Sequence, residues 1–241
     1  MPLPLRILIH GASGRMGQAL SRLAAAEPGR WEVAAAVAGR VPAQRVVDGV
    51  PHFAAAELSG VPDFEVAIDF SLPQGFDRVL ALCVARGRPL VSGTTGLEPA
   101  QRDALQAAAT SIPVLWASNF SLGVAVLDEL VERAARALPG WDCDIVEAHH
   151  ARKQDAPSGT ALTLGESAAR GGAIPRHASL RAGDIVGEHL VQFTGQGERL
   201  ELVHRATCRD VFARGALQAS GRIHGRPPGR HTLRGLLFDG A

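Results

Sequence analysis

Short apolar runs alternate with longer stretches of helix-forming residues through the first half of the chain. Turn-forming residues bound each run, so the runs predict strands and the stretches between them predict helices. The predicted strands cover residues 6–10, 31–38, 65–70, 89–92 and 113–117, and the predicted helices cover residues 18–26, 74–86 and 98–109. This alternation is typical of a parallel sheet with helices on both faces, in which the carboxyl ends of the strands share the edge where ligands bind.

The pattern changes after residue 120. A long helix is predicted over residues 121–138 and a strand over 141–149, and a polar segment rich in glycine follows. Further strands are predicted at residues 185–190, 200–204 and 211–213, before an exposed loop at 221–230 and a short helix at 232–238. Strands grouped in this way predict a second domain of the α+β type. We place the hinges near Phe120 and Cys208–Arg209, so residues 1–120 and 210–241 form the first domain and residues 121–209 the second.

Charge, hydropathy and cysteine content narrow the class of protein. The formal net charge is +1 at pH 7, so charge gives no indication of nucleic acid or an acidic membrane as partner. No apolar stretch is long enough to span a bilayer, and the first residues lack the pattern of a signal peptide. The cysteines Cys83, Cys143 and Cys208 lie far apart and form no CxxC pair. Such a set is typical of a reducing compartment, so we predict a cytoplasmic protein.

Three glycines lie in the turn between the first predicted strand and the first predicted helix. A dinucleotide site needs glycine there because the chain turns sharply, backbone amides approach a pyrophosphate, and the helix packs closely on the strand. The alternative is an ordinary strand–helix turn, since glycine-rich turns are common. The position of the loop favours a Rossmann-like dinucleotide-binding domain, and the predicted contacts are Gly11, Ala12, Ser13, Gly14, Arg15 and Met16.

The end of the second predicted strand bears on the choice of cofactor. An NAD site usually carries an acidic residue there for the adenosine ribose, whereas an arginine suits the 2′-phosphate of NADP. The strand ends Ala38-Gly39-Arg40, without a carboxylate. Arg40 is therefore predicted to contact the cofactor, with NADPH preferred and NADH as the open alternative. The competing interpretation is a solvated loop arginine.

Two further segments follow predicted strands at the same sheet edge. They are rich in small and hydroxylated residues whose backbone groups can bind a nicotinamide and its ribose, although each is also compatible with an ordinary turn. The predicted contacts are Gly93, Thr94, Thr95, Ala117, Ser118, Asn119 and Phe120. Asp69 is expected to cap the helix after Pro73 rather than contact the cofactor. Trp116, Trp141 and His204 are expected to be structural.

Residues 147–162, with the sequence EAHHARKQDAPSGTAL, carry the densest set of reactive side chains. Histidine as a residue type titrates near neutrality and can move a proton, which makes His149 and His150 candidates, and Lys153 adds a second acid and a partner for carboxylates. The Pro-Ser-Gly-Thr sequence that follows opens a helix, an arrangement that binds anions. A metal site is the first alternative, but adjacent histidines on an extended segment point to opposite faces and no further ligand spacing completes it. A solvated basic loop is the second alternative.

With these motifs the chain resembles the dihydrodipicolinate reductase family. The resemblance rests on GASGRMG at residues 11–17, SGTTG at 92–96, ASNFSLGV at 117–124, residues 147–162, and RAGDIVGEH at 181–189, all in family order. It implies hydride transfer from NAD(P)H to an unsaturated heterocyclic dicarboxylate, in lysine and diaminopimelate biosynthesis.

The resemblance also implies roles for individual residues. His149 becomes the general acid/base and Lys153 the proton donor, while the substrate carboxylates are bound by His150, Ser158, Gly159 and Thr160. It further implies a homotetramer built through the second domain, and closure of the two domains over the substrate. From the charge, hydropathy and ligand spacing described above, we expect no metal, nucleic acid or membrane to take part.

The sequence departs from the family pattern at three places. The acidic residue after the second strand is absent, the stretch Ala169–Leu180 is short at the periphery of the second domain, and Ala151 and Arg152 replace residues that are often basic or histidine. Two other functions compete with the reductase: an imine or amino-acid dehydrogenase of similar build, and a regulatory protein that binds NADPH without turnover. Neither accounts for His149, Lys153 and the Pro-Ser-Gly-Thr turn occurring together.

Overall fold

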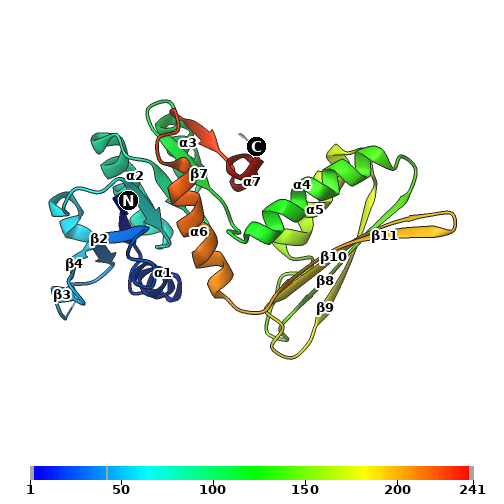
Figure 1. Cartoon of the computed structure of the whole chain (residues 1–241), viewed down its shortest axis with the longest axis horizontal. Coiled ribbons are helices and arrows are strands. Elements are labelled where there is room, and N and C mark those ends of the chain that lie inside the picture. Colours follow the sequence, from blue (N-terminus) through cyan, green and yellow to red (C-terminus); the bar gives the residue numbers. More distant parts are fainter. Residues whose placement is uncertain (1–2, 42, 239–241) are drawn as a thin grey trace. The chain divides into compact units, whose positions relative to one another are not determined.

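The structure is a computed structural model that describes residues 3–41 and 43–238. The chain divides into two compact units (Figure 1). The first consists of residues 1–120 and 212–241, and the second of residues 121–211.

The first unit is built on a sheet with the strand order β12-β7-β6-β5-β1-β2-β4-β3. Every neighbouring pair is parallel except β3 and β4, which pair antiparallel. The strands are β1 (Leu5–His10), β2 (Trp31–Ala38), β3 (Val46–Val47), β4 (Val50–Ala54), β5 (Val66–Asp69), β6 (Leu90–Ser92), β7 (Pro113–Trp116) and β12 (Gly229–His231). This parallel, Rossmann-like sheet confirms the predicted fold class of the first domain, and it places the ends of β1, β5 and β6 beside one another.

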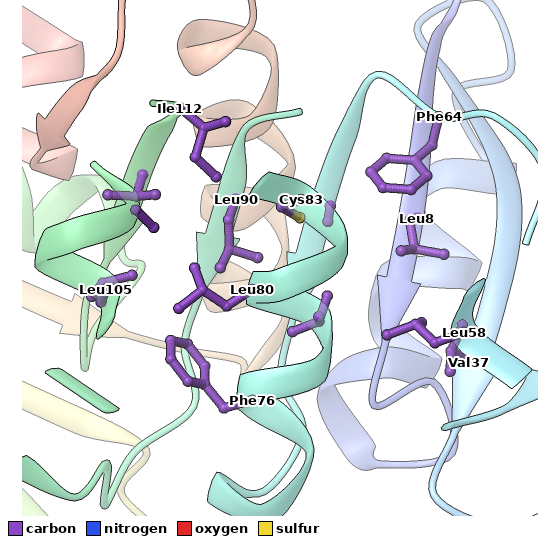
Figure 2. Packing of buried hydrophobic residues seen from close by; sticks show 14 of the residues in the cluster. Leu8, Val37, Leu58, Phe64, Phe76, Leu80, Cys83, Leu90, Leu105 and Ile112 are labelled. Atoms are coloured by element: carbon purple, nitrogen blue, oxygen red, sulfur yellow. The ribbon is translucent and has the colours of Figure 1, made fainter. Parts of the chain in front are cut away.

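Helices and one 3-10 turn pack around this sheet. They are α1 (Arg15–Ala25), η1 (Ala55–Gly60), α2 (Pro73–Arg86), α3 (Pro99–Ala108), α6 (Asp210–Ile223) and α7 (Leu233–Phe238). Helix α2 begins with proline at its first turn and is capped after Arg86 by Gly87, whose φ of +61° is the left-handed conformation that glycine adopts without strain. Figure 2 shows Phe76, Leu80 and Cys83 of α2 in the same buried apolar cluster as Leu90 of β6.

The second unit is a four-stranded sheet with the order β11-β10-β8-β9, covered on one face by two helices. Its strands are β8 (Asp142–His149), β9 (Pro175–Arg181), β10 (Gly187–Gly195) and β11 (Glu198–Ala206), and its helices are α4 (Leu122–Ala137) and α5 (Gly159–Arg170). Alternate residues of β8 and β10 point toward the helices, as in Ile145 and Val191, and form the apolar core of this unit. This mixed sheet with helices on one side confirms the predicted α+β character.

The predicted strand at residues 211–213 is wrong, because these residues lie inside α6. Buried residues of α6 recur at helical spacing, at Ala213, Ala216, Leu217, Ser220 and Ile223, and a three-residue apolar run was too short a window to reveal that period. The predicted loop at 221–230 is wrong at both ends, since α6 runs to Ile223 and β12 begins at Gly229. Strands β3, β4 and β9 were not predicted at all.

Strand β9 occupies much of the stretch that the sequence analysis treated as a trimmed periphery. It is an edge strand that pairs parallel with β8, and its middle residues are exposed. Because both faces of the strand carry polar side chains, the chain shows no alternation of apolar and polar positions there.

Candidate active site

The glycine loop joins β1 to α1 in a turn that only glycine fits. Gly11 has a φ of +84°, and a Cβ atom there would lie 2.4 Å from the carbonyl oxygen of Phe70. A Cβ atom at Gly17 would lie 2.4 Å from the carbonyl oxygen of Gly11, because α1 packs directly on the loop. The loop therefore has the sharp turn and the close helix–strand approach that a dinucleotide site needs.

Several amides of this loop are already used within the protein. Gly11 and Ala12 both donate to the carbonyl oxygen of Val37 at 2.9 Å, and Gly14 donates to Gly11 at 3.0 Å. The first turn of α1, at Arg15 and Met16, carries the amides that a helix leaves without an intrahelical acceptor, together with the positive end of the helix dipole. An anion at this loop would be bound chiefly by the start of α1, while Gly11 and Ala12 shape the turn.

The segment after β2 presents a cation to solvent. Gly39 and Arg40 are both exposed, and β2 ends at Ala38 without a carboxylate. The residues of the first unit thus fit a dinucleotide. The glycine loop has no room for a Cβ atom at Gly11 or Gly17, the start of α1 can bind the pyrophosphate, and the guanidinium of Arg40 is exposed beyond β2.

The two other predicted cofactor segments lie side by side. Ala117 donates its amide to the carbonyl oxygen of Ser92 at 3.1 Å, and the indole of Trp116 donates to the carbonyl oxygen of Thr94 at 2.8 Å. In the first segment Gly93 is half-buried, Thr94 is buried and Thr95 is exposed. In the second segment Ala117 and Asn119 are half-buried and Ser118 is exposed, whereas Phe120 is buried against the ring of Phe70 at a centroid distance of 5.3 Å.

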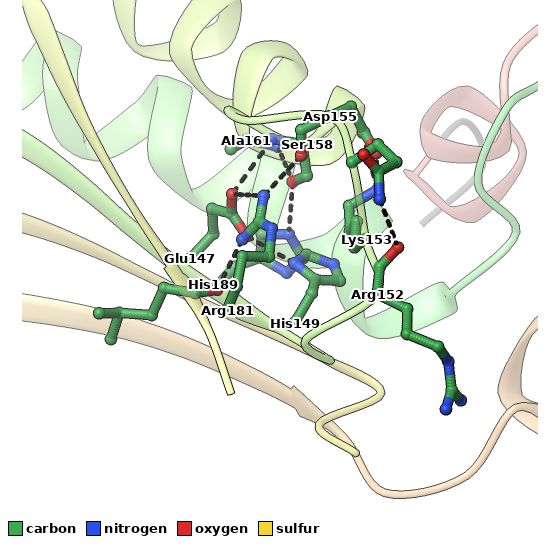
Figure 3. Close-up of polar contacts among 11 residues, drawn as sticks. Glu147, His149, Arg152, Lys153, Asp155, Ser158, Ala161, Arg181 and His189 are labelled. Atoms are coloured by element: carbon green, nitrogen blue, oxygen red, sulfur yellow. Dashed lines mark hydrogen bonds and ion pairs between the residues drawn. The ribbon is translucent and has the colours of Figure 1, made fainter. Parts of the chain in front are cut away.

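In the second unit a buried carboxylate organises the candidate catalytic residues (Figure 3). Glu147 and His149 lie two residues apart on β8 and therefore share the face covered by the helices. The Nδ1 atom of His149 lies 2.5 Å from Oε2 of Glu147, and the guanidinium of Arg181 donates to both carboxylate oxygens at 2.9 and 2.7 Å. Figure 3 shows these three side chains pointing toward one another, while Arg152 points away from them.

The environment of Glu147 holds it in its ionised form. Burial alone would raise the pKa of this carboxyl, but hydrogen bonds from Arg181, Ser179 and His149 lower the pKa to about 2. An ionised carboxylate only accepts hydrogen bonds, so the proton between the two side chains resides on Nδ1 of His149. This leaves Nε2 as the ring nitrogen of His149 that is free to take up or release a proton.

The same carboxylate also holds the predicted anion-binding turn. The amide of Ser158 donates to Oε1 of Glu147 at 3.2 Å, and Oγ of Ser158 accepts from the amide of Ala161 at 3.2 Å as the N-cap of α5. Ser158 is buried, Thr160 is half-buried, and Gly159 is exposed with no atom within 4 Å of an added Cβ. The start of α5 is thus fixed from inside while Gly159 faces open space.

The remaining two predicted residues lie on the segment after β8. Lys153 forms an ion pair with Asp155, with its Nζ atom 2.6 Å from Oδ1. His150 is half-buried, and desolvation together with the positive charges of Arg209 and Arg152 lowers its pKa. The two adjacent histidines therefore differ in environment: His149 at the end of β8 is buried among polar partners, and His150 just after β8 lies in the field of several cations.

Sequence reasoning assigned no role to Glu147, Arg181 or His189. His189 on β10 lies opposite Glu147 of β8 and opposite His204 of β11, so the three side chains form a row across the sheet. Its ring lies 5.3 Å from that of His149 and its Nε2 atom 3.4 Å from Oγ of Ser158. Burial and the neighbouring His149 and His204 lower its pKa to about 4. Arg181 and His189 are the two ends of the RAGDIVGEH segment, the one signal that could have identified them.

His204 contacts the start of α4 in a similar way. Its Nε2 atom lies 3.2 Å from Oγ of Ser121, which caps α4 by accepting from the amide of Val124 at 3.3 Å. An added Cβ at Gly123 would lie 2.7 Å from the His204 ring. His204 thus supports a helix start.

Within residues 3–41 and 43–238, no group of three or more His, Cys, Asp or Glu side chains is placed to hold a metal ion. In the same ranges no helix combines the length and the apolar character needed to cross a membrane.

Comparisons with known proteins cover nearly the whole chain. A family model for the N-terminus of dihydrodipicolinate reductase matches residues 5–120, and one for its C-terminus matches residues 123–237. The chain is 74% identical to the 4-hydroxy-tetrahydrodipicolinate reductase of Stenotrophomonas maltophilia over 97% of this chain and 98% of that protein. It is 71% identical to the Xanthomonas campestris reductase and 68% identical to the Xylella fastidiosa reductase, covering 98% of each.

Solved structures agree on the fold. A dipicolinate-bound dihydrodipicolinate reductase from Paenisporosarcina sp. TG-14 matches with a TM-score of 0.82, covering 95% of this chain and 98% of that one at 21% identity. A diaminopimelate dehydrogenase from Corynebacterium glutamicum matches with a TM-score of 0.60 at 13% identity, covering 97% of this chain and 94% of that one. At these identities the likeness extends to the fold alone.

Proposed function

The chain belongs to the dihydrodipicolinate reductase family, and from that membership we propose that it catalyses the NAD(P)H-dependent reduction of 4-hydroxy-tetrahydrodipicolinate to tetrahydrodipicolinate in lysine and diaminopimelate biosynthesis. The observation that carries the proposal is the position of Glu147. One ionised carboxylate orients His149 for proton transfer and holds Ser158 at the start of the anion-binding turn. A site for a dicarboxylate that must be protonated needs both functions within reach of one another.

The first unit would hold the cofactor, whose nicotinamide supplies a hydride from C4 when bound. The start of α1 offers amides to the pyrophosphate, and the segments around Gly93 and Ser118 lie at the same sheet edge for the nicotinamide end. Arg40 offers its guanidinium to a 2′-phosphate, so NADPH is the preferred cofactor in this proposal and NADH the secondary one.

His149 acts as the general acid/base in this proposal. Once the 4-hydroxyl group has left as water, hydride addition to the unsaturated ring leaves an enamine-like carbanion, and a proton must reach it to complete the reaction. Because the carboxylate of Glu147 fixes the Nδ1 proton, His149 delivers or takes its proton at Nε2. Arg181 keeps Glu147 ionised, so it supports His149 without contacting the substrate.

The substrate carries two carboxylates, and the residues after β8 offset them. Gly159 and Thr160 open α5 with amides and a hydroxyl, at the positive end of the helix dipole. Lys153 adds positive charge nearby, and His150, whose lowered pKa favours the neutral ring, offers a ring N–H. In the absence of substrate Lys153 is neutralised by Asp155, so binding exchanges one carboxylate partner for another before Lys153 donates a proton.

We propose a homotetramer in the cytoplasm. The sheet face that α4 and α5 leave uncovered carries a row of apolar residues, with Leu190 opposite both Val203 and Val146, and Val146 opposite Ala178. Val203 is 43% exposed. An uncovered apolar row of this kind favours contact with a second copy of the sheet. The three cysteines are free thiols, which supports a reducing compartment.

An assay of NADPH oxidation tests the function against its competitors. The substrate is the product of dihydrodipicolinate synthase, supplied in a coupled reaction. We expect substrate-dependent oxidation by the wild type and a loss of kcat of about 10²-fold or more in His149→Gln. No oxidation by the wild type would reject the reductase in favour of another dehydrogenase or of a protein that binds NADPH without turnover. An unchanged rate in Lys153→Ala would reject only the role given to Lys153.

A further inference from the structure

A buried carboxylate in the first unit lies where three neighbouring strands end. Asp69 is the last residue of β5, and its register partners are His10 at the end of β1 and Ser92 at the end of β6. Its side chain is 0% exposed, and it receives hydrogen bonds from Nδ1 of His10 at 2.7 Å, Oγ of Ser92 at 2.8 Å and Oγ1 of Thr94 at 2.8 Å. The amide of Ser71 adds a fourth contact at 3.2 Å.

This arrangement differs from the expected role of Asp69 as a helix cap. Helix α2 starts after Leu72 without a side-chain cap. The side-chain partners of Asp69 instead lie on both sides of it: His10 immediately before the glycine loop, Ser92 at the end of β6, and Thr94 in the turn that follows β6. Phe70 strengthens the same junction, because its amide donates to the carbonyl oxygen of His10 at 3.0 Å.

The polar groups of Thr94 are all used inside the protein. Its hydroxyl donates to Asp69, its amide donates to Oγ of Ser92 at 3.2 Å, and its carbonyl oxygen accepts from the indole of Trp116 at 2.8 Å. Thr94 is 2% exposed. It was predicted to contact the cofactor, but each of its polar groups already has a partner within the protein.

The turn after β6 therefore has an inner and an outer set of residues. Ser92 and Thr94 point inward to Asp69, whereas Gly93 is half-buried and Thr95 is exposed. An added Cβ at Gly93 would lie 2.1 Å from the Phe70 ring, so only glycine fits this turn as it stands.

A buried carboxylate needs this many donors because an ionised group away from water is strongly destabilised without them. Burial alone would raise the pKa of Asp69, but the contacts from His10, Ser71 and Thr94 lower it, so the group is ionised. An apolar residue of similar size would fill the same space without needing any hydrogen-bond donors. The hydrogen bonds of Asp69 therefore serve to hold the ends of β1, β5 and β6 in one register.

We propose that Asp69 is a positioning residue for the cofactor: with His10 it fixes the Ser92–Thr95 turn against the glycine loop, so that Gly93 and Thr95 present the nicotinamide end of the site. The proposal rests on the proposed function, because it requires a dinucleotide at this edge. Thr94 acts through Asp69 and contacts no ligand.

Hydroxyl-specific variants of Thr94 provide the test. Thr94→Val removes the donor to Asp69 at nearly constant volume, and Thr94→Ser restores the hydroxyl. The dissociation constant for NADPH is measured by titration of nucleotide fluorescence, together with KM for the heterocyclic substrate. We expect Thr94→Val to weaken NADPH binding about tenfold and Thr94→Ser to bind as the wild type does, with KM for the heterocycle unchanged in both. Thr110→Val, which removes an exposed hydroxyl of the same unit, is the matched control.

Asp69→Asn tests the carboxylate itself, with Asp63→Asn as control, since Asp63 pairs with Arg6 and Arg88 at the surface. We expect a loss of NADPH affinity of tenfold or more in Asp69→Asn and none in Asp63→Asn. If Asp69→Asn does not fold, the Thr94 pair decides the question. Wild-type affinity in Thr94→Val, or an equal loss in Thr94→Val and Thr94→Ser, would overturn the proposal. Failure of the wild type to bind NADPH would instead overturn the proposed function.

Discussion

Replacing Glu147 with glutamine keeps the volume of the side chain and removes its charge. The side chain of Glu147 is 0% exposed and accepts hydrogen bonds from Arg181, His149 and the amide of Ser158. Glutamine presents one oxygen and one NH₂ group, so it cannot accept from all of these donors. Arg181 loses its paired acceptor, and Nδ1 of His149 loses the partner that fixes its proton.

The size of the effect follows from the pKa of Glu147. The folded-state pKa of about 2 lies below the ordinary value of 4.5, a gap of roughly 2.5 units. At ~1.36 kcal/mol per unit the ionised carboxylate contributes about 3 kcal/mol to the free energy of unfolding. Because the folded pKa is depressed, this contribution is complete above about pH 5 and disappears as the pH falls through 2. Glu147→Gln lacks the contribution at every pH.

Urea unfolding followed by Trp141 fluorescence measures this loss in the second unit. Trp141 is the one tryptophan of residues 121–211, so Trp31→Phe and Trp116→Phe isolate its signal. We expect Glu147→Gln to lower the free energy of unfolding by about 3 kcal/mol at pH 7, by much less near pH 2, and to reduce kcat about 10²-fold.

The matched control is Glu57→Gln, which breaks an exposed carboxylate–arginine pair in the first unit. It should leave both the unfolding of the second unit and kcat unchanged. The reasoning is refuted if Glu147→Gln unfolds as the wild type does at pH 7, or if its kcat stays within twofold of the wild type.

Two further predictions concern the cofactor and the buried histidine row. Arg40→Ala should lower kcat/KM for NADPH about tenfold and leave kcat/KM for NADH nearly unchanged, as measured by steady-state kinetics; equal or better use of NADH by the wild type would contradict the cofactor preference. His189 has a folded-state pKa of about 4 against an ordinary 6.5, so the unfolded chain binds more protons in this window and stability falls as the pH drops from about 6.5 to 4. His189→Asn keeps a polar group near Ser158. Between pH 7 and 4 its free energy of unfolding should fall by up to ~3 kcal/mol less than that of the wild type. If the unfolding of the variant shows the same pH dependence as that of the wild type, His189 is not neutral in the folded protein.

Much of the first unit could be predicted from the sequence because its strands are buried on both faces. The predicted strand over 31–38 coincides with β2, and the prediction over 6–10 differs from β1 by one residue. Continuous apolar runs between turn residues mark such strands locally. Strand β9 gave no such signal, since Pro175–Arg181 is a largely exposed edge strand whose position depends on its pairing with β8 and on contacts with α5. Helix α6 was missed because three apolar residues in a row look alike in a strand and in a helix.

The candidate site was predictable where one segment carries it. His149, Lys153 and the Ser158–Thr160 turn lie within a dozen residues, so their chemistry is visible in the sequence. Glu147 is two residues from His149, yet its role depends on Arg181, which is 34 positions away and reaches it only because β8 and β9 pair in parallel. A glutamate near a histidine in the sequence does not by itself indicate a role in proton transfer. That role becomes visible only when the structure shows Arg181 holding the carboxylate of Glu147 in its ionised form.

Asp69 and Glu147 follow the same physical rule in separate units. Each is a fully buried carboxylate, each accepts from Nδ1 of a histidine, and each also holds a turn that the proposed reaction needs. A buried charge is tolerated only where several donors converge on it, and in both units some of these donors come from segments far away in the chain. The partners of Asp69 are 59, 23 and 25 positions away in the chain. Motifs therefore reveal the groups that face the ligand, whereas the parallel register of the sheet decides which buried acid holds those groups in place.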